Sequence, residues 1–163
     1  VYQNTVDSRN IWGVGDLAVE KGKLFLLDEV AYRILIWNTI PTANFAPADV
    51  VIGQIDFTTV PMGSEPVTDS NFNYPQGMSV LNGRLAVADT ENNRILIWKS
   101  IPEKNGVPAD VVWGQPDFVS VKPNFGGLSA QSVYGPLGVY LTKDRIFIAD
   151  TQNQRVIGVA TSL

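Results

Sequence analysis

The chain has 163 residues, 45% of them hydrophobic and 17% charged, a balance typical of a globular protein rather than a disordered one. Its net charge of −4 disfavours nucleic acid as a partner, and RNA binding would need a basic patch on one rim. Cys and His are absent, which excludes disulfides, thiol nucleophiles, thiolate metal sites and histidine as a base or metal ligand.

In chain order the sequence predicts short strands and turns, without helical periodicity. Residues 1–6 are strand-like and precede a first unit at about residues 14–74. This unit contains the apolar run Leu-Phe-Leu-Leu at residues 24–27, entered through the turn Lys21-Gly22, and a further apolar strand at residues 34–37.

The second unit, at about residues 75–135, has the clearest pattern of four strands. We expect these strands at residues 77–81, 84–88, 94–98 and 109–113. The first two are joined by Asn82-Gly83, a dipeptide suited to a two-residue type I′ hairpin turn. The third unit, residues 136–163, turns at Lys143-Asp144 and stops before a fourth strand would begin.

These three units are copies of one repeat with a period of 61 residues. The acidic and basic residues that keep this spacing are Asp28, Asp89 and Asp150, and Arg33, Arg94 and Arg155. A second block recurs at the same distance, because Ala-Asp-Val-Val-Ile-Gly-Gln at residues 48–54 matches Ala-Asp-Val-Val-Trp-Gly-Gln at residues 109–115.

The central strands of each unit are apolar on both faces, as in residues 24–27 and 95–98. A strand of that kind in an antiparallel meander must be covered on both sides. Radial packing of four-stranded blades around an axis provides this cover, so we expect an all-β fold of the β-propeller type with three blades in a single domain, residues 1–163.

The motif that carries the repeat is Pro-x-Gly, an apolar strand, and then Ala-Asp-Thr-x-Asn-x-Arg-Ile. It stands at residues 75–77 with 88–95 and, ending in Val, at residues 136–138 with 149–156. The first copy departs from it, with Val14 for the Pro, Asp16 for the Gly and Ala31 for the Asn. Over nearly the whole chain this pattern resembles the NHL repeat. The resemblance implies a propeller, usually of six blades, in a family of protein- and RNA-binding modules, sensor domains and a metal-dependent lyase, so it does not choose a function.

Three blades do not close a ring, because closed propellers have about four to eight. We expect a homodimer in which a two-fold axis along the channel joins two half-propellers into six blades. The strand-like residues 1–6 could then complete the last blade of the partner chain by strand exchange. The competing interpretation is a fragment of a longer propeller, and the first residue, Val rather than Met, fits either a processed chain or a fragment.

The recurrent charged residues have two interpretations. Asp28, Asp89 and Asp150 could form a carboxylate ring for a cation, or each could accept hydrogen bonds from its own turn while Arg33, Arg94 and Arg155 hold the blades. Recurrence in every blade favours the structural interpretation. We likewise expect Trp37, Trp98 and Trp113 in the core, and Asp49 and Asp110 in turns.

Positions that differ between the copies are better candidates for binding. The loops that enter the inner strands carry Trp12, Asp16, Asn73, Tyr74 and Tyr134, and we expect these residues near the channel mouth. Ordinary loop packing is the alternative. Asp16 and Glu20 are two carboxylates that could hold a hard cation, although two are few for such a site.

These observations predict a non-catalytic binding module that presents a channel mouth or rim to a protein, peptide or carbohydrate, without a cofactor. The alternative is a lactonase-like hydrolase or a lyase with a carboxylate-held divalent cation; the metal-binding His residues of the family's lyase are absent. No apolar run reaches the roughly 20 residues of a membrane helix, so we expect a soluble protein with no membrane contact. The lack of Cys fits the cytosol without excluding secretion, and an extracytoplasmic location is slightly favoured.

Overall fold

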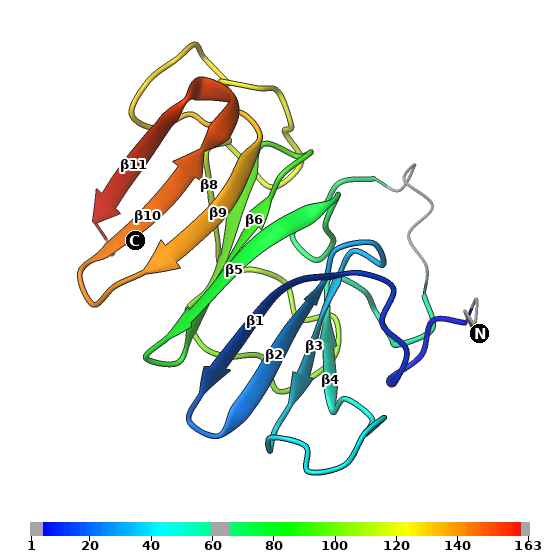
Figure 1. Ribbon diagram of the computed structural model, residues 1–163. Coiled ribbons are helices and arrows are strands. Elements are labelled where there is room, and N and C mark those ends of the chain that lie inside the picture. Colours follow the sequence, from blue (N-terminus) through cyan, green and yellow to red (C-terminus); the bar gives the residue numbers. More distant parts are fainter. Residues whose placement is uncertain (1–4, 60–65, 161–163) are drawn as a thin grey trace.

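The computed structural model describes residues 5–59 and 66–160, which form three antiparallel sheets placed side by side as successive blades (Figure 1). The first blade has the strand order β1-β2-β3-β4 and the second β5-β6-β7-β8, whereas the third consists of β9, β10 and β11. The all-β class expected from the sequence is confirmed. Within the described residues, no helix is long and apolar enough to cross a membrane.

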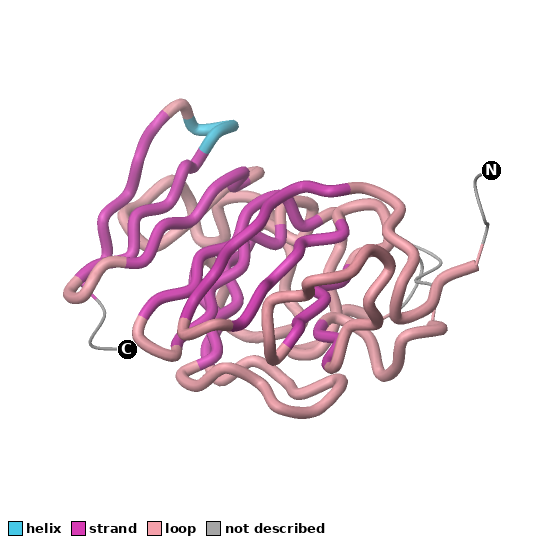
Figure 2. Tube along the Cα trace, turned by 60° about the horizontal axis from the view of Figure 1, so that its bottom comes forward, coloured by secondary structure: helices cyan, strands magenta, loops and turns pink. Residues whose placement is uncertain are grey.

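The strands follow the 61-residue repeat. In the first blade they are β1 (Val14–Glu20), β2 (Lys23–Asp28), β3 (Arg33–Trp37) and β4 (Val50–Ile52). In the second they are β5 (Pro75–Leu81), β6 (Arg84–Asp89), β7 (Arg94–Trp98) and β8 (Val111–Trp113). In the third they are β9 (Pro136–Leu141), β10 (Arg145–Asp150) and β11 (Arg155–Ala160). A short 3₁₀ turn, η1 (Thr151–Asn153), joins β10 to β11 and is drawn in cyan in Figure 2.

The turn between the two inner strands differs in the third blade. Lys21 and Gly22 have φ of 49° and 78°, and Asn82 and Gly83 have 53° and 78°, which is the left-handed pair that a type I′ turn requires. The predicted turn at Asn82-Gly83 is thereby confirmed. In the third blade Lys143 and Asp144 are not among the residues with positive φ, and the N–H of Thr142 closes the turn by donating to the carbonyl of Arg145 (2.8 Å).

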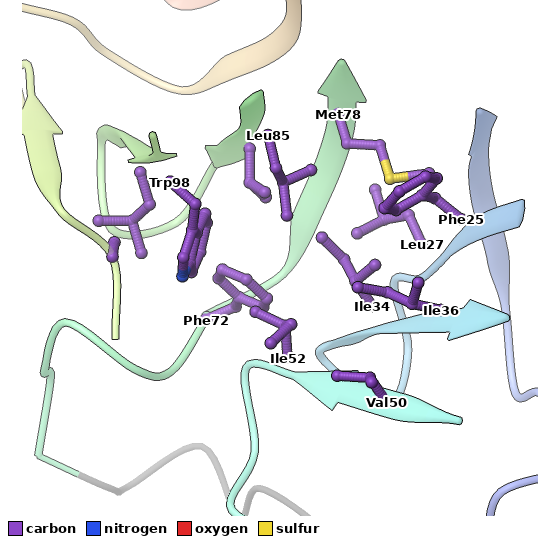
Figure 3. Close-up of a cluster of buried hydrophobic side chains, with 13 residues drawn as sticks. Phe25, Leu27, Ile34, Ile36, Val50, Ile52, Phe72, Met78, Leu85 and Trp98 are labelled. Atoms are coloured by element: carbon purple, nitrogen blue, oxygen red, sulfur yellow. The ribbon is translucent and has the colours of Figure 1, made fainter. Parts of the chain in front are cut away.

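The two largest apolar clusters lie between neighbouring blades, and a smaller one lies on the first blade alone. Phe25 and Leu27 face the second blade, where Met78 of β5 lies against them (Figure 3). On the same interface Phe72 meets the Trp98 ring edge to face, with ring centroids 6.0 Å apart. Burying each such side chain contributes about 1.5–3 kcal/mol, so contact between blades is a main source of stability. Trp37 and Trp98 are buried as predicted, at 6% and 1% exposure, and Trp113 is half-buried.

The second and third blades share a similar apolar layer. Its buried members come from both sheets and are Ala86, Ala88, Ile95, Ile97, Val133, Val139, Leu141, Ile146, Ile148 and Ile157. The second blade therefore presents one face to the first blade and the other to the third, which explains why its strands are apolar on both faces.

The structure describes only the end of the strand predicted at residues 1–6. Thr5 and Val6 do not lie in a strand, and residues 1–4 lie outside the described part of the chain. Val6 is 6% exposed, and the next residue, Asp7, accepts a hydrogen bond from Nη1 of Arg33 through its carbonyl (3.0 Å). The described N-terminal segment is thus attached to the first blade of its own chain.

Candidate functional site

The recurrent aspartate and arginine form an ion pair in every blade. The distance from the arginine Nε to the aspartate Oδ2 is 3.1 Å for Arg33–Asp28, 2.6 Å for Arg94–Asp89 and 2.6 Å for Arg155–Asp150. The first two pairs are fully buried. Each aspartate ends the second strand of its blade and each arginine begins the third, so the pair spans the polar turn between them.

These ion pairs hold the loop that precedes each inner strand. The other aspartate oxygen, Oδ1, accepts a hydrogen bond from the backbone N–H of Trp12 (3.1 Å), Asn73 (2.7 Å) or Tyr134 (2.8 Å). The arginine Nη2 donates to a carbonyl two residues before that position, in Asn10, Asn71 or Ser132. A constant polar clamp therefore fixes the backbone at one repeat position, which carries a different side chain in each blade.

The clamp in the second blade places a carboxylate in a dry environment. Burial raises the pKa of Asp89, and the Arg94 guanidinium with the N–H donors of Asn73 and Asn92 opposes that rise. Each aspartate pairs with the arginine of its own blade. In the described part of the chain, no group of three or more carboxylates is placed to hold a metal ion.

The structure separates the five residues predicted at the channel mouth. Trp12 is 37% exposed and lines a broad cleft of about 1160 Å³ on the outer side of the first blade. Asn73 lines a smaller cleft of about 250 Å³ between the first two blades, and Tyr74 contacts the Tyr32 ring edge to face at 6.0 Å. Tyr134 is 41% exposed on the third blade. Trp12, Asn73 and Tyr134 thus occupy equivalent loops without sharing one cleft, whereas Asp16 lies in β1.

The two carboxylates considered for a cation join neighbouring blades instead. Asp16 Oδ2 accepts the backbone N–H of Met78 (3.0 Å), while its Oδ1 accepts the N–H of Leu17 (2.8 Å). Both oxygens of Glu20 accept the N–H of Gly83 in the hairpin turn of the second blade (3.1 Å). Each carboxylate therefore stabilises the contact between the first and second blades.

Sequence reasoning missed two buried glutamines. Gln54 and Gln115 follow the fourth strand of their blades and are 4% and 9% exposed. Each side-chain amide donates to a carbonyl of the polar turn, in Ala31 for Gln54 and in Asn93 for Gln115, while neither Oε1 has a partner in the described chain. The sequence contains one clue to this role: the Gly-Gln pair recurs after the fourth strand in both blades, as expected of a side chain that links that strand to the polar turn.

The second copy of the repeat matches a known family model. Residues 72–98, which contain β5, β6 and β7 with the Asp89–Arg94 clamp, match the family model described as NHL repeat. The second copy is thus similar to an NHL repeat, as the sequence motif indicates. The NHL match lies in the second copy, and the first and third copies are related to it by the 61-residue period.

Similarity to a solved structure is more distant. Kuenenia stuttgartiensis Hydrazine Synthase aligns with 99% of this chain and 40% of its own, at 10% sequence identity and a TM-score of 0.46. The chain thus spans less than half the length of that protein. No curated protein matches the sequence.

Proposed function

We propose that the chain is a non-catalytic interaction module, in which two copies close a six-bladed ring whose inner loops bind a protein, peptide or carbohydrate. The observation that carries the proposal is the contrast at one repeat position. The clamp beneath it is constant, whereas the side chain above it is Trp12, Asn73 or Tyr134. A framework that fixes the backbone and varies the side chain suits recognition, because ligand-binding residues are commonly placed on loops held by a rigid scaffold.

The chemistry of these side chains supports binding of an amphipathic ligand. Trp12 and Tyr134 are more than one third exposed and combine a large apolar ring with a polar hydrogen-bonding group. Asn73 adds an amide that can donate and accept. Aromatic rings with a few polar groups are typical of surfaces that bind peptides and sugars.

Ring closure is supported first by the outer face of the first blade. Leu17 and Val19 of β1 are 56% and 59% exposed. Their counterparts 61 residues on are Met78, which is 5% exposed because the first blade covers it, and Val80, which is partly buried in the same core. The face of the first blade that is turned away from the second blade is thus apolar like a blade interface, but no blade of the described chain packs against it.

The outer face of the third blade complements this surface. Tyr140 is 66% exposed, Phe147 39% and Val156 71%. Phe147 occupies the repeat position of Phe25, which is fully buried between the first and second blades. A second copy that placed its first blade against this face would bury Phe147 as Phe25 is buried. In a two-fold dimer the first blade of each chain would pack against the third blade of the other, and these two contacts would close the ring.

Strand exchange through residues 1–6 is not needed for this closure. Arg33 binds the carbonyls of Asp7 and Asn10, so this part of the N-terminal segment is held on the first blade of its own chain. Closure of the ring depends instead on the two apolar blade faces.

Equilibrium binding of the full chain to peptide and glycan arrays tests the recognition proposal. We expect binding to a defined subset of probes that falls at least about tenfold in the double variant Trp12→Ala, Tyr134→Ala, because both aromatic contacts are lost. The control is Val119→Ala, at an exposed residue in a different loop, which should leave binding unchanged. Silence on both arrays, or equal loss in the control, would contradict the proposal.

A further inference from the structure

The outer edge of β11 differs from the corresponding edges of the first two blades. In those blades β3 is covered by β4 and β7 by β8. In the described part of the chain, β11 pairs with β10 alone. An uncovered strand edge presents a row of backbone donors and acceptors that can pair with another segment.

The covering segment in the first two blades has the sequence Ala-Asp-Val-Val-x-Gly-Gln-x-Asp-Phe, at residues 48–57 and 109–118. It makes the same main-chain contacts in both. The N–H of Asp49 donates to the carbonyl of Ile36, and that of Asp110 to the carbonyl of Ile97, both at 2.9 Å. The aspartate Oδ2 then accepts the N–H of the residue that follows the third strand, Asn38 or Lys99, at 2.7 Å.

The end of the segment reaches the arginine of the clamp. The carbonyl of Phe57 accepts a hydrogen bond from Nη1 of Arg33 (3.0 Å), and the carbonyl of Phe118 accepts one from Nη1 of Arg94. One ten-residue segment therefore covers a strand edge, caps its end and completes the hydrogen bonding of a buried guanidinium.

The third blade offers the same groups without these contacts. Gly158 and Ala160 occupy the repeat positions of Ile36 and Asn38 on the edge of β11. Arg155 donates from Nε to Asp150 and from Nη2 to two carbonyls, while Nη1 has no acceptor among the described residues. Its side chain is 28% exposed, compared with 0% for Arg33 and Arg94.

A cleft lies beside this edge. It has a volume of about 670 Å³ and is lined by Gly158 and Ala160 of β11, by Trp113 of β8 and by Phe125 from the preceding loop. Its wall is thus partly backbone and partly aromatic, which suits an extended peptide with apolar side chains.

We propose that the outer edge of β11 binds an extended segment of the type Ala-Asp-apolar-apolar-apolar-Gly-Gln-x-Asp-Phe by β-augmentation. The apolar triplet pairs with Val156–Gly158, the aspartate caps the N–H of Ala160, and the last carbonyl accepts Nη1 of Arg155. This site is separate from the loops of the proposed function and does not require ring closure.

The repeat also predicts which N–H groups of the ligand matter. The N–H of Val51 points away from β3, since it donates to Asn105 of the next blade (3.0 Å). Because N–H groups alternate along a strand, those of its two neighbours point to β3. In a peptide with the sequence of residues 109–118, the N–H of Val111 therefore faces the protein edge and that of Val112 faces away.

The test is titration of the ¹⁵N-labelled full chain with this ten-residue peptide, followed by amide hydrogen exchange and by fluorescence anisotropy. We expect saturable binding and exchange slowed about tenfold or more at Val156, Gly158 and Ala160, whose N–H groups face outward. The N–H groups of Ile157 and Val159, which face β10, should be unaffected.

Peptide variants separate strand pairing from nonspecific adhesion. Val111→Pro should weaken binding about tenfold or more because it removes an N–H of the ladder, whereas the matched Val112→Pro should bind within about threefold. A peptide of residues 1–6 should not bind. The proposal would be overturned by absent binding, by equal effects of the two prolines, by protection of the three amides before peptide is added, or by preferential binding of the peptide of residues 1–6.

Discussion

The second and third blades contain the same clamp in different surroundings. In both, Nε of the arginine lies 2.6 Å from the aspartate, and the aspartate accepts a backbone N–H from the loop just before the inner strand. Arg94 is fully buried beneath its neighbours, whereas Arg155 is 28% exposed. The motif thus sets the local geometry and buries the aspartate in both blades, whereas burial of the arginine depends on the covering segment and the adjacent blade.

The largest expected effect is on the buried pair. Arg94→Met leaves Asp89 buried without its cation and should lower the free energy of unfolding by about 3–5 kcal/mol. Arg155→Met also leaves a buried aspartate, Asp150, without its cation, but water can enter where the partly exposed arginine stood, so the loss should be smaller, about 1–2 kcal/mol. Urea denaturation followed by tryptophan fluorescence measures both. Equal losses would show that burial by neighbouring segments is unimportant to the pair.

A smaller loss of stability is expected at a repeat position that is glycine in both blades but has different neighbours in each. A Cβ at Gly77 would lie 2.5 Å from the carbonyl oxygen of Leu137, whereas a Cβ at the equivalent Gly138 would meet only the Ala149 Cβ, at 3.6 Å. Gly77→Ala should therefore cost about 1–3 kcal/mol by separating the second and third blades.

Gly138→Ala is the matched variant. It should leave the fold of the single chain intact and weaken association, since the proposed ring brings another blade against Gly138 as the third blade lies against Gly77. Denaturation of dilute protein and sedimentation at higher concentration distinguish the two effects. A cost for Gly138→Ala in the monomer as large as that for Gly77→Ala would contradict the packing described here.

The smallest expected effect is on the pKa of Asp117, in an exposed turn that follows β8. The described part of the third blade has no equivalent turn. Backbone N–H groups of Ser120 and Val119 hold the pKa of Asp117 below its ordinary value of 3.8. A lowered pKa in the folded state means that this carboxylate stabilises the turn above pH 3.8 and that the contribution is lost as the pH falls through the folded pKa. A ¹³C NMR titration should place its midpoint below 3.8, and a midpoint above that value would refute the assignment.

Much of the fold could be predicted from sequence because its period is regular. The strands expected at residues 77–81, 84–88 and 94–98 occur as Pro75–Leu81, Arg84–Asp89 and Arg94–Trp98. The fourth was placed too early, since β8 begins at Val111. The reason is the side chain of Asp110, which accepts the N–H of Lys99 and so precedes the regular ladder.

The candidate site was less predictable. Equivalent positions in the repeat identified Trp12, Asn73 and Tyr134, but repeat position does not fix whether side chains on successive blades converge. Trp12 lines the outer cleft of the first blade and Asn73 a cleft between two blades. Contacts between blades of one chain, such as the hydrogen bond from Met78 to Asp16, depend on how the blades pack. The sequence of a single repeat therefore does not predict them.

The mass of the chain in solution, measured by size-exclusion chromatography with light scattering, tests ring closure by two copies most directly. We predict twice the mass of one chain at micromolar concentration. Phe147→Glu should reduce this to one chain, because it places a charge in the proposed apolar interface, while Val119→Glu should not. A stable wild-type monomer at micromolar concentration would contradict ring closure by two copies.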